Sequence, residues 1–476
     1  MTTAEQEYDV IVLGAGSTGE NVADIAVRGG LSAVLVESEL VGGECSYWAC
    51  MPSKALLRGS EVLAEARAVS GAAAAVTGEQ DAAATLARRD GFTSHWDDAS
   101  QVEWVEGAGI ALVRGRGRLA GEKRVVVAQA DGTELTLTAR HAVAVCTGSR
   151  AAVPPVDGLA DVQPWTPREA TSAKEAPRRL VVVGGGYVGC EMATAWQQLG
   201  SSVTLLQHGD RLLPHLEPAA GEAVAESLRA LGVDVQLGTG VRSARREGDE
   251  VVLVCESGDE VRGEEVLVAT GRAANTDEIG LDTIGLEPGG YLDVDESLQV
   301  PGVPWLYGVG DVNGRAQLTH MGKYQARQAG AAIVARARGE QVDLGDWSPF
   351  VATADRRATP SVVFTEPQVA AVGLTAAQAA DAGLPHRVVE YPIGSVAGAS
   401  VFADGYTGTA IAVVDTEREV LLGVTFVGAG VAELLHSATI AVAGEVPISR
   451  LWHAVPSYPT ISEIWLRLLE TWRDGD

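Results

Sequence analysis

The hydrophobic pattern at the start of the chain predicts a strand, a glycine turn, a helix and a second strand. Apolar residues occupy positions 10–13, a glycine-rich turn covers 14–19, and helical periodicity follows over 20–28. A glycine pair ends this helix, and a second apolar run covers 32–36. This order is typical of a βαβ unit, which builds parallel α/β sheets.

The same pattern returns in the middle of the chain. An apolar run at 180–183 leads into a second glycine turn at 184–189, a helical stretch at 191–199 and another apolar run at 202–206. Such an internal repeat predicts two dinucleotide-binding modules in one chain. The patterns elsewhere predict a β-meander over 102–145, a Pro- and Ala-rich linker over 151–177, and an α+β region from 347 with strands at 361–364 and 410–415 and helices at 375–382 and 431–443.

The spacing of the first glycine turn indicates a pyrophosphate site. Gly14 permits a tight turn, Gly16 lets the backbone approach a phosphate, and Gly19 lets helix and strand pack closely. The helix that begins near Ser17 then presents free N–H groups and a partial positive charge. Glu37 ends the second strand about 20 residues later, where a carboxylate accepts a hydrogen bond from a ribose hydroxyl.

The second turn has the same glycine spacing but a different residue at the ribose position. Gln207 stands where an acid would repel the 2′-phosphate of NADPH, and His208 and Arg211 lie nearby. We therefore expect NADPH to be preferred over NADH, although the two cations also suit a solvated loop. The glycines of this turn are Gly184, Gly186 and Gly189.

Composition and charge narrow the function classes. The chain has 476 residues, which suggests about three domains, and its 46% hydrophobic residues fit a globular core. A net charge of −27 argues against a nucleic-acid partner. The N-terminus has no basic, apolar leader pattern and no run is long enough for a bilayer span, so we expect a cytoplasmic protein with no membrane partner. Five cysteines, an odd number, argue against a secreted disulfide scaffold.

Cys45 and Cys50 lie five residues apart at the start of a predicted helix. They can meet across one turn if the backbone is slightly irregular, and a helix N-terminus lowers a thiol pKa. A redox role competes with two other interpretations, a pair of small buried side chains and a metal site. No second Cys or His pair at zinc spacing follows, so we predict no metal site.

With its neighbours, this segment resembles the class I pyridine nucleotide-disulfide oxidoreductases, which include dihydrolipoamide dehydrogenase, glutathione reductase and mercuric reductase. The resemblance covers essentially the whole chain. Its motifs are Gly42-Gly43-x-Cys45-x4-Cys50-x-Pro52-Ser53-Lys54, Thr147-Gly148-Ser149, Ala269-Thr270-Gly271-Arg272, Tyr307-x-x-Gly310-Asp311-Val312, Leu318-Thr319-His320 and Phe364-Thr365-Glu366-Pro367.

The resemblance implies an α/β fold with two Rossmann-like domains, for FAD and NAD(P)H, and a C-terminal α+β dimerisation domain. It also implies FAD as cofactor and a homodimer. The expected domains are 1–150 for FAD, 151–275 for NAD(P)H, 276–346 for a return to the FAD and central domain, and 347–476 for dimerisation.

The resemblance also assigns roles to individual residues. Cys45 would exchange with substrate and Cys50 would face the flavin as a thiolate. Lys54 would pair with Glu191 beside the flavin N5, where a cation stabilises reduced flavin, and Tyr187 would gate the nicotinamide pocket. The further cofactor contacts it implies are Gly43, Thr147, Gly148, Gly271, Gly310 and Asp311, while Cys146, Cys190 and Cys255 lie in apolar segments and are expected to be inert.

The C-terminal motif departs from the family. Disulfide reductases of this family carry His-Pro-Thr-x-x-Glu, whereas this chain has Tyr458 at the histidine position and Glu463 at the acid. A phenol is a poor general base at neutral pH, so oxidation of dihydrolipoamide is disfavoured and reduction of an acceptor is favoured. In the family this motif completes the partner subunit's site, and His453 is an alternative proton carrier.

We therefore predict an FAD enzyme that passes electrons from NADPH to a Cys45–Cys50 disulfide and on to a small-molecule acceptor. An NADPH:quinone or metal-ion reductase is the first alternative. Mercuric reductase also has tyrosine at the histidine position, but this chain has no C-terminal cysteine pair. A non-catalytic flavin-containing redox sensor is the second alternative.

Overall fold

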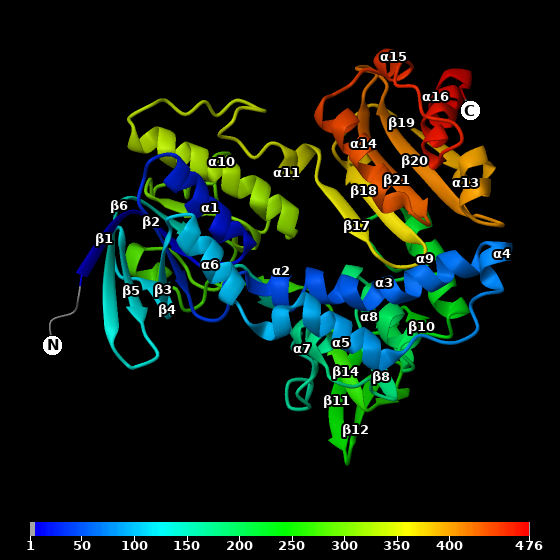
Figure 1. Cartoon of the computed structure of the whole chain (residues 1–476), viewed down its shortest axis with the longest axis horizontal. Helices are drawn as coiled ribbons and strands as arrows, with labels where there is room; N and C mark the ends of the chain where they lie inside the picture. The colour runs from blue at the N-terminus through cyan, green and yellow to red at the C-terminus, as the bar shows by residue number, and fades with distance from the viewer. Residues whose placement is uncertain (1–4, 476) are drawn as a thin grey trace. The chain divides into compact units, whose positions relative to one another are not determined.

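The computed structural model describes residues 5–475. By its internal contacts the chain forms two compact units, which are described separately below (Figure 1). Unit 1 contains Met1–Met51, Asp90–Ala152 and Gly271–Asp355, and unit 2 contains Pro52–Arg89, Val153–Thr270 and Arg356–Asp476. Among the described residues, no helix combines the length and the hydrophobicity that a bilayer crossing requires.

Unit 1 is built on a seven-stranded mixed sheet. The predicted βαβ opening is correct, and the predicted meander is correct from residue 116 onward. Upstream of it the chain instead forms a helix and a strand that joins the parallel part of the sheet. The parallel strands are β3 (Ala111–Arg114), β2 (Ala33–Glu37), β1 (Glu5–Leu13), β6 (Glu134–Val145) and β16 (Leu306–Gly308), and the antiparallel strands β5 (Arg124–Ala128) and β4 (Arg116–Leu119) extend the sheet beyond β6.

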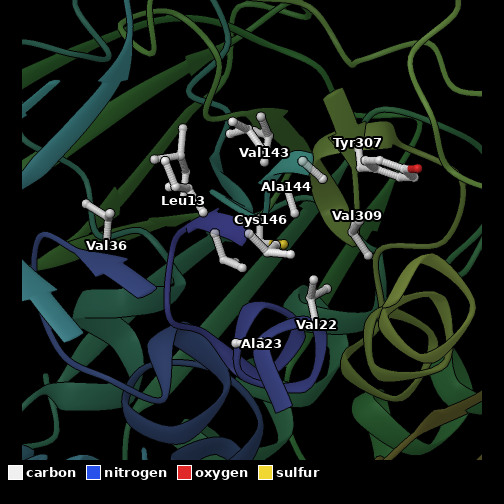
Figure 2. Packing of buried hydrophobic residues seen from close by; sticks show 14 of the residues in the cluster. Leu13, Val22, Ala23, Val36, Val143, Ala144, Cys146, Tyr307 and Val309 are labelled. Atoms are coloured by element: carbon white, nitrogen blue, oxygen red, sulfur yellow. The ribbon is translucent and has the colours of Figure 1, made fainter. Parts of the chain in front are cut away.

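Two helices, α1 (Ser17–Arg28) and α10 (Thr319–Ala337), pack side by side in unit 1 (Figure 1). Small residues allow the close approach, because a side chain at Gly330 would collide with Ile25. Figure 2 shows part of the apolar core, with Leu13 and Val143 of neighbouring strands on one side and Val22 and Ala23 of α1 on the other. The core thus fixes the end of β1, from which the first glycine turn leaves.

Unit 2 holds the second βαβ module. Its four-stranded parallel sheet has the order β10-β9-β8-β14, and a small antiparallel sheet of β11, β12 and β13 is inserted between β10 and β14 in the chain. The elements are β8 (Arg179–Val183), α8 (Tyr187–Gln198), β9 (Ser202–Gln207), α9 (Pro218–Ala230), β10 (Asp234–Leu237), β11 (Val241–Glu247), β12 (Glu250–Cys255), β13 (Glu260–Gly263) and β14 (Glu265–Val268).

The C-terminal part of unit 2 is a five-stranded antiparallel sheet in the order β17-β18-β21-β20-β19, with α14 packed against it. This agrees with the expected α+β region. The elements are β17 (Pro360–Val363), β18 (Gln368–Gly373), α12 (Ala376–Asp381), β19 (His386–Pro392), α13 (Ala397–Phe402), β20 (Gly408–Asp415), β21 (Leu421–Gly428), α14 (Val431–Ala443), α15 (Ile448–Leu451) and α16 (Ile464–Asp474).

The sequence patterns missed several helices. The stretch expected to be a linker contains α7 (Pro167–Ser172), which a capping box between Thr166 and Glu169 begins. The remaining elements are α2 (Gly43–Tyr47), α3 (Cys50–Arg67), α4 (Ser70–Ala73), α5 (Ala82–Phe92), α6 (Ala99–Gly107), β7 (Ser149–Ala151), β15 (Arg272–Ala274), α11 (Ala354–Arg357) and the 3-10 turns η1 (Ser94–Trp96), η2 (Leu281–Ile284), η3 (Asp311–Asn313), η4 (Ile393–Ser395) and η5 (Ile461–Glu463).

Candidate functional site

Cys45 and Cys50 lie on two successive helices of the chain rather than at the start of one. Cys45 belongs to the short helix α2, and Cys50 is the first residue of α3. The backbone breaks between them at Trp48, where φ is −136°. The amides of Trp48 and Ala49 both donate to the Glu44 carbonyl, at 2.8 and 2.7 Å. This irregular turn is what allows the two side chains to meet.

The two thiols form one hydrogen-bonded pair. The hydrogen bond with Cys50, burial and the negative charge of Cys50 raise the pKa of Cys45, while Thr319 and Lys323 oppose the rise. The Cys50 sulfur also lies 3.2 Å from the Thr319 hydroxyl oxygen, at the start of α10. The contact between the two thiols therefore disfavours the ionisation of Cys45.

The other three cysteines are buried. Burial raises the pKa of Cys146 and of Cys190, and it also raises the pKa of Cys255. A thiol that resists ionisation is a poor nucleophile. Their environments agree with the expectation that these cysteines are inert.

Lys54 and Glu191 form an ion pair within unit 2. The Lys54 ammonium lies 2.7 Å from the Glu191 carboxylate, and the Lys54 side chain is 37% exposed whereas Glu191 is buried. The other carboxylate oxygen accepts from the Phe364 amide at 3.0 Å, and the ammonium sits 4.8 Å from the centre of the Phe364 ring. Lys54 also lies one helical turn after Cys50 on α3, so both face the same side of that helix.

The first glycine turn has the shape that a dinucleotide pyrophosphate requires. Gly14 has a φ of +98°, and a side chain there would collide with the Cys146 carbonyl. Gly43 lies close to Gly16, since a β-carbon added to Gly43 would lie only 2.7 Å from the α-carbon of Gly16. No side chain caps the N-terminus of α1, so its amides are available to a phosphate. The residues present thus fit the FAD that the sequence implies.

Glu37 lies at the end of β2, as expected. One of its carboxylate oxygens accepts from the Ala15 amide at 2.7 Å, and the other accepts from the Glu39 amide at 2.8 Å. Burial raises the pKa of Glu37, while these amide bonds oppose the rise. A carboxylate has further lone pairs, so these bonds orient Glu37 and leave it able to accept from a ribose.

The second glycine turn repeats this geometry within unit 2. Gly184 has a φ of +112°, and the space above Gly186 is open. The Gln207 side-chain oxygen accepts from the Gly185 amide at 2.8 Å, which is the counterpart of the bond from Ala15 to Glu37. The neutral Gln207 therefore occupies the position where the first module has its acid.

Three of the other residues implied for nucleotide binding lie in unit 2, and two of them, Arg211 and Tyr187, have polar contacts. His208 is exposed and its ring lies near Gly240. The Arg211 guanidinium donates to the Pro214 carbonyl at 2.7 Å. The hydroxyls of Tyr187 and Ser361 are 3.0 Å apart, and burial raises the pKa of Tyr187.

A polar chain in unit 1 connects Asp311 to the cysteine segment. The Ser149 hydroxyl donates to Asp311 at 2.6 Å, and the Arg272 guanidinium donates to Ser149 at 2.6 Å and to Glu44 at 2.7 Å. The role of Arg272 was not assigned from the sequence, although the motif that contains it was noted. Four of the remaining implied residues also lie in unit 1. The Thr147 hydroxyl donates to the Asn275 carbonyl, the Gly310 amide donates to the Gln325 side chain, and Gly148 and Gly271 have positive φ.

The structure does not bring Tyr458 and Glu463 together. Tyr458 is 77% exposed, whereas Glu463 is buried and pairs with Arg467 of α16 at 2.7 Å. The second Glu463 oxygen has no hydrogen-bond partner among the described residues. Arg467 lies one helical turn after Glu463, so the acid binds its own helix instead of residue 458. His453, the alternative proton carrier, is exposed.

Comparison with known proteins agrees with this geometry. The profile of the pyridine nucleotide-disulphide oxidoreductase family matches residues 8–327, and the profile of its dimerisation domain matches 359–468. A dihydrolipoyl dehydrogenase from Haloferax volcanii is 31% identical over 474 residues, which cover 97% of this chain and 95% of the relative. A mercuric reductase from Staphylococcus aureus is 30% identical over 467 residues, covering 96% and 81%.

A solved structure shares the fold along its whole length. It is the HOCl-induced flavoprotein disulfide reductase RclA from Escherichia coli in a Cu(II) complex, with a TM-score of 0.83, 22% identity and coverage of 98% and 99%. The two family profiles thus match the chain one after the other, with the dimerisation domain second. The chain belongs to the pyridine nucleotide-disulphide oxidoreductase family and is a flavin-dependent enzyme of that family.

Proposed function

We propose that the enzyme carries electrons from NADPH to a Cys45–Cys50 disulfide, whose dithiol form then reduces a small-molecule acceptor. The observation that supports this most is the pairing of these two thiols. Both are half-buried and hydrogen-bonded to each other, while the other three cysteines are enclosed in apolar surroundings. Two thiols in hydrogen-bonding contact are suited to open and close a disulfide.

Bound FAD supplies the two-electron chemistry between a nicotinamide and a disulfide. In unit 1, Gly14, Gly16 and the amides of α1 would hold its pyrophosphate, Glu37 its ribose, and Asp311 its ribityl chain. Lys54 would place a positive charge where reduced flavin becomes negative. Its partner Glu191 keeps this half-buried ammonium oriented.

The preference for NADPH rests on Gln207. Its amide replaces a carboxylate that would repel the 2′-phosphate, and its hydrogen bond to Gly185 holds it at the ribose position. Arg211, a few residues further along the chain, would supply a positive charge for that phosphate. NADH remains a weaker donor in this proposal.

The acceptor is proposed to be reduced rather than oxidised. A general base is needed to take protons from a dithiol substrate, and Tyr458 is a phenol that Glu463 does not contact. The dimerisation domain supports a homodimer, in which the exposed Tyr458 would reach the partner's site. Dihydrolipoamide oxidation is therefore the least favoured activity.

A metal-ion reductase is the second candidate. The relatives include mercuric reductases, and the RclA structure is a Cu(II) complex. A metal ion needs no deprotonation before it is reduced, so the absence of a base at position 458 would not hinder it. A quinone reduced directly at the flavin is a further alternative.

The test is an anaerobic titration with NADPH. Wild-type enzyme should consume one more equivalent than the Cys45→Ser and Cys50→Ser variants, because only the wild type has a disulfide to reduce. Cys255→Ala is the matched control and should behave as the wild type. Equal consumption by wild type and both serine variants would reject the disulfide as an electron carrier. Retention of full turnover by the serine variants would instead identify a quinone reductase.

A further inference from the structure

The segment from Ser94 to Trp96 in unit 1 has an unusual backbone. Three consecutive residues, Ser94, His95 and Trp96, have φ values of 49°, 55° and 59°, and none of them is glycine. Residues other than glycine normally enter this left-handed region singly. Such strain persists only where the surroundings fix the backbone, and it gathers at functional sites.

This segment and the residues that follow it contact the cysteine segment. The Trp96 indole N–H donates to the carbonyl of Tyr47 at 3.2 Å. Two residues later, the Asp98 carboxylate accepts from the Val41 amide at 2.7 Å and pairs with Arg114 at 2.6 Å. Residues 96–98 therefore hold both ends of the stretch 41–47, which carries Cys45.

The cysteine segment needs such support because its own helix is short. Helix α2 ends at Tyr47, and the chain must break before Cys50 begins the next helix. The Tyr47 side chain is fixed, since its ring is buried and its hydroxyl donates to the Val41 carbonyl at 3.1 Å. The hydrogen bond from the Trp96 indole holds the backbone of the same residue at its carbonyl.

We propose that Trp96 and Asp98 are positioning residues that hold Cys45 against Cys50 and thereby set the reduction potential of the pair. This inference rests on the proposed redox role of the two cysteines. Disulfide closure removes two electrons and two protons from the thiols, and its equilibrium depends on how often the sulfur atoms meet. Loosening the stretch 41–47 lets the open dithiol gain freedom, so the disulfide becomes easier to reduce.

The experiment measures this equilibrium in the purified holoenzyme. Glutathione buffers reduce the disulfide to the dithiol while two glutathione molecules become one oxidised glutathione. After equilibration the samples are unfolded in acid, alkylated, and the reduced fraction is read by mass spectrometry. Trp96→Phe removes the indole N–H and keeps an aromatic ring. Trp104→Phe is the matched control, because Trp104 is 44% exposed on the nearby helix α6.

Loss of the Trp96 bond should shift the equilibrium about three- to tenfold toward the dithiol, which follows from the usual net strength of one hydrogen bond. That shift equals a rise in reduction potential of about 15–30 mV. Trp104→Phe should leave the potential unchanged. A second pair of variants tests the strain itself. His95→Gly suits a positive φ and should keep the wild-type potential, whereas the β-branched His95→Val should raise it.

The outcomes separate this inference from the function on which it rests. If residues 45 and 50 of the wild type never interconvert between dithiol and disulfide, the proposed function fails. If they interconvert but Trp96→Phe and His95→Val both keep the wild-type reduction potential, only the positioning role of Trp96 and Asp98 is refuted. Should Trp96→Phe fail to fold, the two exposed His95 variants decide the question.

Discussion

Glu20 is an acid buried in the first turn of α1, and its pKa leads to a testable pH dependence. The side chain is 9% exposed, and its Oε1 atom has no hydrogen-bond partner among the described residues. Burial raises the pKa of Glu20 from 4.5 to about 7, with Lys323 opposing the rise and Glu37 adding to it. Its charged form is therefore disfavoured by folding.

The size and sign of the effect follow from linkage. Between pH 4.5 and about 7 the folded chain holds a proton on Glu20 that the unfolded chain has lost. Folding stability therefore falls as pH rises through this window, and the penalty is complete above the folded-state pKa. At 1.36 kcal/mol for each pKa unit, the penalty is roughly 3 kcal/mol above pH 7 and absent below the unfolded pKa.

The test compares wild type with Glu20→Gln, which removes the charge and keeps the shape. Urea unfolding, followed by tryptophan fluorescence, is measured at about pH 5 and about pH 8.5, on either side of the window. The difference in unfolding free energy between variant and wild type should be about 2–3 kcal/mol more favourable to the variant at the higher pH than at the lower pH. Glu103→Gln, an exposed change on α6, is the control and should show no such difference.

A gain of equal size at both pH values would show that Glu20 acts through packing and not through its charge. A variant that loses stability at the higher pH would show that the carboxylate is stabilised in the fold, and it would refute the reasoning. Measuring the enzyme with and without FAD would show whether a bound pyrophosphate raises this pKa further.

Three further changes test the remaining parts of the site. Glu191→Gln breaks the ion pair with Lys54 and should lower stability by about 1–3 kcal/mol, less than for a fully buried pair, and slow flavin reduction in stopped-flow traces. Gln207→Glu places a carboxylate opposite the 2′-phosphate and should lower kcat/KM for NADPH at least tenfold, or about 1.4 kcal/mol, while NADH kinetics change little. Tyr458→His alone should not restore dihydrolipoamide oxidation, whereas its combination with Arg467→Leu should, because the acid that Arg467 binds is then released to orient the imidazole.

Local signals predicted much of the fold. The helix expected over 431–443 occurs as α14, and both βαβ units begin and end within a few residues of their predicted positions. Their glycine spacing and apolar strands are encoded within about 30 residues. A helix was predicted at the cysteine pair and occurs as α3, but its length and the helix α5 were not predicted, because both helices are rich in alanine and polar residues without a clear apolar stripe. Their stability comes from packing within unit 2, which sequence periodicity does not report.

The site was predicted less evenly. The pairing of Lys54 with Glu191 came from the family resemblance, and the structure has these groups 2.7 Å apart. The joint role of Tyr458 and Glu463 came from the same source, but here the acid pairs with Arg467 instead. A resemblance transfers positions along the chain. It does not reveal that Arg467, one helical turn after Glu463, pairs with the acid that would orient a histidine at position 458.

Glu44 lies directly before Cys45, and its contact with the distant residue Arg272 changes the charge beside that thiol. A carboxylate directly before Cys45 would by itself disfavour a thiolate there. Arg272 lies 2.7 Å from Glu44 and neutralises that charge, and the same guanidinium donates to Ser149, whose hydroxyl holds Asp311. One cation thus balances the acid beside Cys45, which is proposed to be redox-active, and supports the residue proposed to bind the ribityl chain. We therefore expect Arg272→Ala to change both the reactivity of Cys45 and the affinity for FAD, because the same guanidinium contacts Glu44 and Ser149.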